Sequence, residues 1–202
     1  RPSKLRLPDS TEATHRSPAA MPALTSTETP GGGTTYSLTL QTLVLMTLLS
    51  FIPALVLMMT SFTRIVIVFS FLRNAMGLQQ TPPNQVLIGL ALFLSLFIMQ
   101  PVLADMNQNA VQPYIAGELE WDETLENLQV PLKEFMLKQT KADDLNLFLS
   151  LKGNTEEIRQ VDPDKLLGLG LEVIVPSFIT SELKRAFTIG FLLFLPFLVI
   201  DM

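Results

Sequence analysis

The chain has 202 residues, of which 48% are hydrophobic and only 16% are charged. An average soluble domain carries about 25% charged residues, so this composition favours a membrane protein. The net charge of −5 offers no basic field for nucleic acid, and the absence of cysteine excludes disulfides and thiolate metal sites. A histidine-based triad or metal centre would depend on His15 alone. We therefore expect a protein that is not an enzyme and has no cofactor, metal or nucleic-acid partner.

Residues 1–37 are rich in proline, serine, threonine and glycine, and they include the run Pro30-Gly31-Gly32-Gly33. Such a segment cannot bury enough apolar surface to offset the entropy lost on ordering. We predict a disordered leader over residues 1–37, which serves most simply as a linker.

The first apolar run extends from Leu43 to Phe62 without a charged residue. As a helix it would span about 30 Å, the thickness of the hydrocarbon core of a bilayer. Pro53 lies in the middle of this run and is expected to kink it. Apolar residues resume after Arg64 and continue to Leu72, so the segment is longer than one straight crossing needs and must tilt, bend or extend beyond the bilayer.

A second apolar run covers residues 86–104, and a polar connector rich in glycine and proline joins the two runs. Two apolar helices with a short connector predict an antiparallel hairpin over residues 38–104. The only charges between residues 64 and 104 are those of Arg64 and Arg73. The positive-inside rule then places the connector in the cytoplasm.

Residues 105–185 contain most of the acidic residues of the chain. Asp122 and Asp143 are typical helix caps, and Pro131 suits the first turn of another helix. Apolar side chains follow both Pro131 and Asp143 at helical spacing. This pattern predicts a helical extramembrane domain on the side opposite the connector.

A third apolar run occupies residues 186–202. It is short for a crossing, so we expect it to begin a second apolar hairpin that is truncated here and continues beyond residue 202. The predicted fold class is all-α, a membrane protein built of apolar helical hairpins with an inserted helical extramembrane domain.

Long motifs in the apolar runs are similar to one family. They are MMTSFTRIVIVFSFLRNAMG at residues 58–77, PPNQVLIGLALFL at 82–94, PSFITSELKRAFTIGFLLFLPF at 176–197 and the shorter PLKEFM at 131–136. Together they resemble the FliP family of flagellar type III export-gate subunits, from about Gly31 to Met202.

The resemblance implies a structural pore subunit of the flagellar export gate, in the bacterial inner membrane at the flagellar basal body. Residues 105–185 would then be periplasmic. The implied partners are about five copies of the chain in a helical arrangement, FliQ-like and FliR-like subunits, a FlhB-like gate protein, membrane lipid and unfolded flagellar substrates. The equivalent subunit of a virulence-type injectisome is the alternative, and the glycine-rich leader looks more like the flagellar branch.

Four residues are candidates for contacts between subunits: Phe135, Phe148, Glu182 and Arg185. Aromatic side chains often anchor interfaces, but Phe135 and Phe148 could equally be core residues of one subunit. Glu182 and Arg185 could form an ion pair within one helix or between neighbouring chains.

Five further residues are structural or pore candidates: Pro53, Met58, Met59, Arg64 and Gly89. Arg64 is either a functional charge between apolar runs or a side chain that reaches the cytoplasmic interface. The methionines could line a conduit or simply pack between helices. Gly89, like other small residues of its helix, would permit close helix contact.

Two other classes of function predict different sequence features. A small-solute transporter would place several ionisable residues inside apolar spans, and residues 43–62 and 86–104 have none. A membrane anchor that presents residues 105–185 as a binding module is the third reading. The paired acids Asp143-Asp144 and Glu156-Glu157 fit solvated faces and helix caps better than catalysis or calcium binding.

Overall fold

The computed structural model describes residues 27–28, 34–35, 38–153 and 163–202, and the chain divides into two units, residues 1–51 and 52–202. In the first unit, β1 (Thr27–Glu28) pairs antiparallel with β2 (Thr34–Thr35). The rest of the predicted leader lies outside the described residues. The helix α1 (Leu38–Met58) begins in this unit, and its side chains from residue 41 to residue 56 are exposed.

The long apolar segment at residues 43–72 forms two helices, which are joined between Met58 and Phe62 and not at Pro53. Helix α1 passes through Pro53 and ends at Met58, and α2 (Phe62–Ala75) begins four residues later. The Thr60 hydroxyl donates to the Leu57 carbonyl and accepts the Phe62 N–H. This local bonding competes with the helical ladder, which explains why the chain breaks here.

The α2 helix and α3 (Asn84–Met106) form the hairpin in the second unit. Gly77 ends α2 with a positive φ of 73°, a conformation that glycine adopts without strain. Across the connector, Arg73 donates to the side-chain oxygen of Asn84 and to the Pro82 carbonyl. On the packed face of α3 the buried residues recur at every fourth position: Leu87, Ala91, Ser95 and Met99.

The α3 helix continues without a gap into the π-helical turn η2 (Asn107–Val111) and α4 (Gln112–Ile115). The chain then reverses and α5 (Trp121–Gln139) packs back against η2 and α3. Asn127 on α5 donates to the Asn109 carbonyl of η2 at 3.2 Å. Pro131 does not start a new helix as expected, because α5 runs through it and only one backbone N–H is lost there.

The remaining helices are α6 (Ala142–Leu151), α7 (Pro163–Leu167) and α8 (Leu171–Asp201). Neither expected aspartate is the residue that precedes its helix: Glu120 precedes α5 and Lys141 precedes α6. Asp122 and Asp143 instead lie in the first turns, where a negative charge complements the helix dipole. The domain boundary expected at residue 185 falls in the middle of α8, which continues without interruption.

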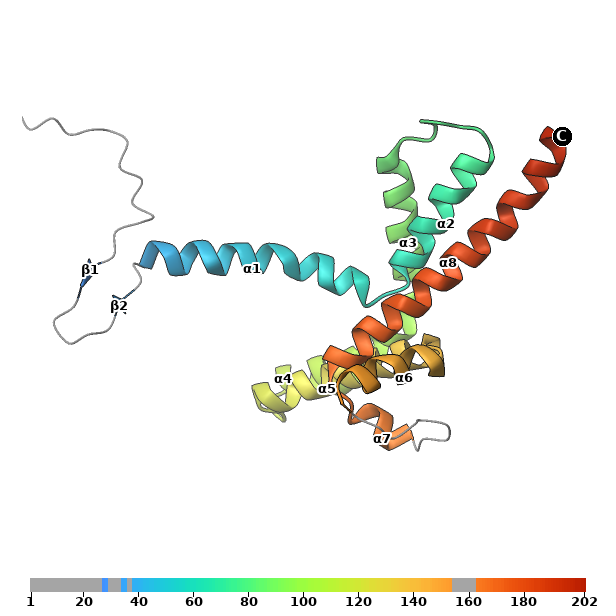
Figure 1. The fold of residues 1–202 in the computed structure, drawn as a ribbon. Coiled ribbons are helices and arrows are strands. Elements are labelled where there is room, and N and C mark those ends of the chain that lie inside the picture. Colours follow the sequence, from blue (N-terminus) through green and yellow to red (C-terminus); the bar gives the residue numbers. More distant parts are fainter. Residues whose placement is uncertain (1–26, 29–33, 36–37, 154–162) are drawn as a thin grey trace, which may run out of the picture. The chain divides into compact units, whose positions relative to one another are not determined.

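Helix α8 runs alongside α2 and across α5 and α6, as Figure 1 shows. Its buried positions Phe178, Glu182, Ala186 and Gly190 recur at intervals of four residues and form one stripe. At Gly190 the backbone approaches Phe71 of α2 so closely that a Cβ atom would lie 2.5 Å from the ring. Phe71 also packs edge-to-face on Phe187, with ring centroids 5.6 Å apart.

Two small clusters form the core where α5, α6 and α8 meet. Met136, Ile174 and Phe178 make the first cluster, and Leu145, Leu149 and Val173 make the second. In the described part of the chain, three helical segments are long and apolar enough to cross a membrane: Leu40–Met58, Asn84–Ile115 and Leu171–Asp201. Apart from the two short strands, the regular elements in that part are helices, so the predicted all-α class is confirmed.

Candidate functional site

A buried ion pair joins α2 to α8. The Arg64 Nε donates to Glu182 Oε2 at 2.7 Å, and Arg64 Nη2 donates to Glu182 Oε1. The Glu182 side chain is only 1% exposed, whereas that of Arg64 is 28% exposed. The two parallel hydrogen bonds are the bidentate geometry in which arginine binds a carboxylate most strongly.

Two further side chains complete this arrangement from α5 and α8. The Gln139 side-chain oxygen accepts from Arg64 Nη2 at 3.0 Å and from Arg185 Nη1 at 3.1 Å. Arg185 Nη1 also lies 3.4 Å from Glu182 Oε1. Two arginines therefore flank one buried carboxylate, and an amide oxygen bridges them. We call Arg64, Gln139, Glu182 and Arg185 the charged junction.

A second buried carboxylate, that of Asp144, lies where α6 meets α8. Asp144 is 1% exposed and accepts from the Ser181 hydroxyl at 2.7 Å and from the Lys184 ammonium. The Ser181 oxygen in turn accepts the backbone N–H of Lys141 at 3.0 Å. The same stretch of α8 thus carries partners for two buried acids.

The pKa of Asp144 reflects these contacts. Burial by itself raises the pKa of a carboxyl group. Hydrogen bonds from Lys184 and Ser181, together with the positive charges of Lys184 and Lys141, outweigh that effect. The net result is a pKa below the usual value for aspartate, so Asp144 is ionised at neutral pH.

These contacts determine how four helices fit together. A buried charge is tolerated only when it keeps its partners, so α2, α5, α6 and α8 can pack in few other registers. The charges are arranged to hold helices rather than to bind a ligand. In the described residues, no group of three or more His, Cys, Asp or Glu side chains is placed to hold a metal ion.

The predicted interface residues all have contacts inside this chain. Phe135 packs edge-to-face on Phe178, with ring centroids 6.0 Å apart, and Phe148 packs beside Leu145 and Leu149. Glu182 and Arg185 belong to the charged junction. Phe135, Phe148 and Arg185 are only half-buried, so part of each remains available to a neighbour.

The predicted pore or structural residues are dispersed. Pro53 and Met58 are exposed on α1, whereas Met59 packs against the core cluster of Met136, Ile174 and Phe178. Arg64 turns toward α8. Gly89 faces outward from α3, and among the described residues outside its own helical turn no atom lies within 4 Å of a Cβ atom placed there.

Sequence reasoning missed Asp144 and Gly190. The sequence favours a solvated face or a helix cap for Asp143-Asp144, whereas the structure buries the Asp144 side chain. It lies on the apolar stripe of α6 with Leu145, Phe148 and Leu149, so an acid within an apolar stripe was the available signal. Gly190 offered no such signal, because its role depends on where Phe71 of α2 comes to lie. Glu156 and Glu157 lie outside the described residues.

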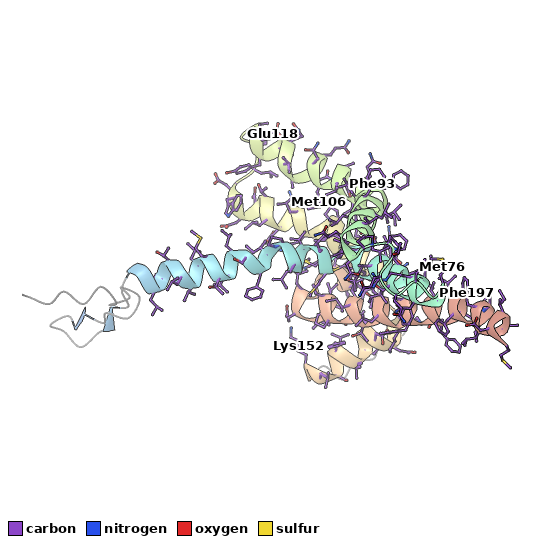
Figure 2. The ribbon with its side chains drawn as sticks, turned by 90° about the horizontal axis from the view of Figure 1, so that it is seen from above. Met76, Phe93, Met106, Glu118, Lys152 and Phe197 are labelled. Atoms are coloured by element: carbon purple, nitrogen blue, oxygen red, sulfur yellow. The ribbon has the colours of Figure 1, made fainter. Side chains whose placement is uncertain are left out.

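Large apolar surfaces remain uncovered in the second unit. On α3, Phe93 is 70% exposed and Phe97 is 69% exposed, and Figure 2 shows Phe93 on the outside of this helix. On the C-terminal half of α8, Phe191 and Leu192 are about as exposed. These side chains require lipid or another protein to cover them.

Three apolar helices of spanning length and a core closed by buried ion pairs define an all-α membrane protein. The sequence model of the FliP family matches residues 45–202, and the chain belongs to this family.

Several proteins named flagellar biosynthetic protein FliP are similar to the chain. It is 46% identical over 184 residues to that of Pectobacterium carotovorum subsp. carotovorum, which covers 91% of the chain and 69% of the relative. It is 48% identical over 181 residues to that of Cereibacter sphaeroides, covering 90% and 58%. It is 45% identical over 166 residues to that of Bacillus subtilis (strain 168), covering 82% and 72%. The chain thus spans only part of the length of these relatives.

Proposed function

We propose that the chain is a structural subunit of the flagellar protein-export gate. In this proposal it assembles with further copies of itself and with FliQ-like and FliR-like subunits, next to a FlhB-like gate protein. The assembly surrounds a conduit for unfolded flagellar substrates. The relatives described above are all named as flagellar proteins, which supports the flagellar gate over the injectisome.

One observation carries the proposal: the two buried carboxylates of the fold are paired inside the chain while its apolar helix faces are bare. Glu182 and Asp144 bind partners within the chain, whereas Phe93 and Phe97 project from α3 with about seven tenths of each side chain exposed. A subunit whose buried charges are satisfied within the chain, and whose apolar helix faces are uncovered, is suited to packing side by side with other subunits in a wall.

The proposed location is the bacterial inner membrane at the base of the flagellum. The connector between α2 and α3 follows Arg73, so the positive-inside rule puts it in the cytoplasm. Helices α5, α6 and α7 lie beyond the opposite end of α3 and would then be periplasmic.

The test is co-expression of the chain with FliQ-like and FliR-like subunits from the same genome, followed by purification in a mild detergent. Size-exclusion chromatography with light scattering should give one complex that contains several copies of the chain, and electron microscopy should show a ring with a central channel. A stable monomer in the presence of both partners would count against the export gate.

The same preparation separates the proposal from the membrane-anchor reading. If α5, α6 and α7 were a binding module on an anchor, replacing residues 84–106 with an unrelated apolar helix would leave partner capture intact. The export-gate proposal expects the complex to be lost, because α3 contributes to the wall itself. Expression of the replaced chain in the membrane fraction is the control.

A further inference from the structure

An apolar groove lies between α5 and α7. It has a volume of about 420 Å³, and Lys133 Nζ of α5 ties its two walls together by donating to the Leu167 carbonyl of α7 at 3.3 Å. Its lining is mostly apolar and consists of Glu134, Leu137, Lys138, Leu166 and Leu167. Among the described residues no side chain fills this groove, so it can take up an apolar side chain from another molecule.

Positive charge predominates at this end of α5. The described stretches 133–141 and 164–167 contain four lysines and two acids. Lys138 and Lys165 are exposed, and neither forms an ion pair with a described residue. We call the groove together with Lys133, Lys138 and Lys165 the lysine groove. An apolar groove with unpaired cations beside it favours an apolar partner that carries acids.

The opposite end of α5 has the complementary composition. In residues 115–126, Ile115 is 71% exposed and Trp121 is 56% exposed. Five acids in the same stretch are exposed and have no ion-pair partner among the described residues. They are Glu118, Glu120, Asp122, Glu123 and Glu126. We call residues 115–126 the acidic tip.

A tight turn holds the acidic tip in a fixed shape. Gly117 has a φ of 77°, and its N–H donates to the Tyr114 carbonyl at 3.1 Å. The Glu118 N–H donates to the Pro113 carbonyl at 2.9 Å, which completes a Schellman motif at the end of α4. Trp121 then packs edge-to-face on Tyr114, with ring centroids 5.8 Å apart. Because this apolar projection is already formed, little conformational entropy is lost when it binds a partner.

The acidic tip and the lysine groove cannot meet within one chain. They lie at the two ends of α5, which has 19 residues and is therefore about 28 Å long. Figure 2 shows Glu118 of the tip and Lys152, which directly follows α6, on opposite sides of the second unit. The tip of one copy can therefore reach only the groove of another copy.

We propose that the acidic tip of one copy of the chain docks in the lysine groove of the next copy. Ile115 and Trp121 supply the apolar contact with the groove, and the acids of the tip face the lysines. The contact is head-to-tail, because the two surfaces that meet are different, and repeated contacts of this kind close into a ring when the rotation between copies allows it. This inference rests on the proposed assembly of several copies and names the surfaces that join them.

The chain contains no cysteine, so cross-linking can be directed to chosen positions. The variant Ile115→Cys, Leu167→Cys is co-expressed with cysteine-free FliQ-like and FliR-like subunits, purified as the complex in mild detergent and treated with a short bismaleimide. We expect a ladder of covalently linked chains that extends beyond the dimer, because each copy has one tip and one groove. Each single-cysteine variant should remain monomeric, since in a head-to-tail contact two tips or two grooves do not meet.

The matched control is Ile115→Cys, Leu147→Cys. Leu147 is 50% exposed on α6 and does not line the groove, so this variant should give no ladder. Dimers from Ile115→Cys alone would indicate a symmetric contact between tips and would overturn the inference. A complex that forms normally but gives no ladder would also overturn it and leave the proposed function intact. Failure of the native chain to form any complex would overturn both.

Charge reversal tests whether the acids and the lysines face each other. In the chain with both cysteines, Glu118→Lys with Glu120→Lys should lower the yield of the ladder about tenfold, because like charges would then meet. Lys138→Glu with Lys165→Glu should have the same effect, and all four changes together should restore the yield to within about twofold. Circular dichroism of each variant checks that it folds. A ladder that neither reversal weakens, or that the combination does not restore, would overturn the proposed docking.

Discussion

Arg64 and Glu182 lie 118 positions apart in the sequence and form the bidentate ion pair that joins α2 to α8. Because Glu182 is buried, its charge depends on this partner and on Arg185. We expect Arg64→Ala to lower the free energy of unfolding by about 3 kcal/mol, since it leaves a buried charge short of a partner. Unfolding of the chain in detergent micelles, followed by circular dichroism, measures the change.

The double variant Arg64→Met, Glu182→Met distinguishes the effect on stability of removing the whole ion pair from the effect of removing one partner only. Replacing both charges by apolar side chains removes the uncompensated charge, so the double variant should be more stable than Arg64→Ala. Equal destabilisation in both variants would mean that the attraction between Arg64 and Glu182 stabilises the fold by more than the free energy needed to bury the Glu182 charge.

The stability of the chain should depend on Asp144 at acidic pH. The folded-state pKa of Asp144 lies below its usual value, so its contribution is fully present above about pH 4 and is lost as pH falls through the lower, folded-state pKa. We expect the difference in unfolding free energy between the native chain and Asp144→Asn to shrink as pH is lowered from 6 to about 2. A constant difference over that range would rule out a role for the Asp144 charge.

Gly190 should not tolerate a side chain. A Cβ atom would lie 2.5 Å from the Phe71 ring, so Gly190→Ala should force α2 and α8 apart and destabilise the fold by about 1–3 kcal/mol. Gly89→Ala is the matched control on α3, where no atom would meet the added methyl group. That variant should be neutral or slightly stabilising in the isolated chain, because alanine favours helix more than glycine does. Thermal unfolding of both variants in the same detergent measures the two changes in stability, and equal stability of the two variants would contradict the close contact at Gly190.

Substitutions at Phe93 and Phe135 should affect assembly and folding differently. Phe93→Ala should leave the stability of the isolated chain within about 0.5 kcal/mol, because the side chain is exposed, yet it should lower the yield of the complex with FliQ-like and FliR-like subunits. Phe135→Ala should cost the isolated chain about 2 kcal/mol through its lost contact with Phe178. A normal complex from Phe93→Ala would remove this face of α3 from the proposed wall.

The helices could be predicted from the sequence wherever an uninterrupted apolar or amphipathic pattern was the only local signal. The run at residues 86–104 has no competing signal and forms most of α3. Neither Pro53 nor Pro131 marks the end or the start of a helix. Helix α1 continues through Pro53 and ends where the Thr60 hydroxyl takes over backbone hydrogen bonds. Pro131 is likewise absorbed inside α5, since packing of that helix offsets one missing bond.

The charged junction could not be assembled from the sequence alone. Glu182 and Arg185 are neighbours on one helix, so their pairing was open to prediction. Arg64 reaches Glu182, and Gln139 reaches both arginines, only because α2 and α5 pack on the same part of α8. Which long-range partner satisfies a charge depends on helix packing, and a single sequence carries no direct signal for it.

The buried stripe of α8, which contacts α5 and α2, has a mechanical consequence. Phe178, Glu182, Ala186 and Gly190 lie in one row on a helix that is unbroken over 31 residues. A helix turns by about 100° per residue, so rotating α8 by a single position would move all four residues away from their partners at once. Helix α8 therefore has few intermediate orientations in which its buried residues keep their partners. Because α8 is one continuous helix, rotation of its apolar half would also displace Glu182 and break its ion pair with Arg64 of α2.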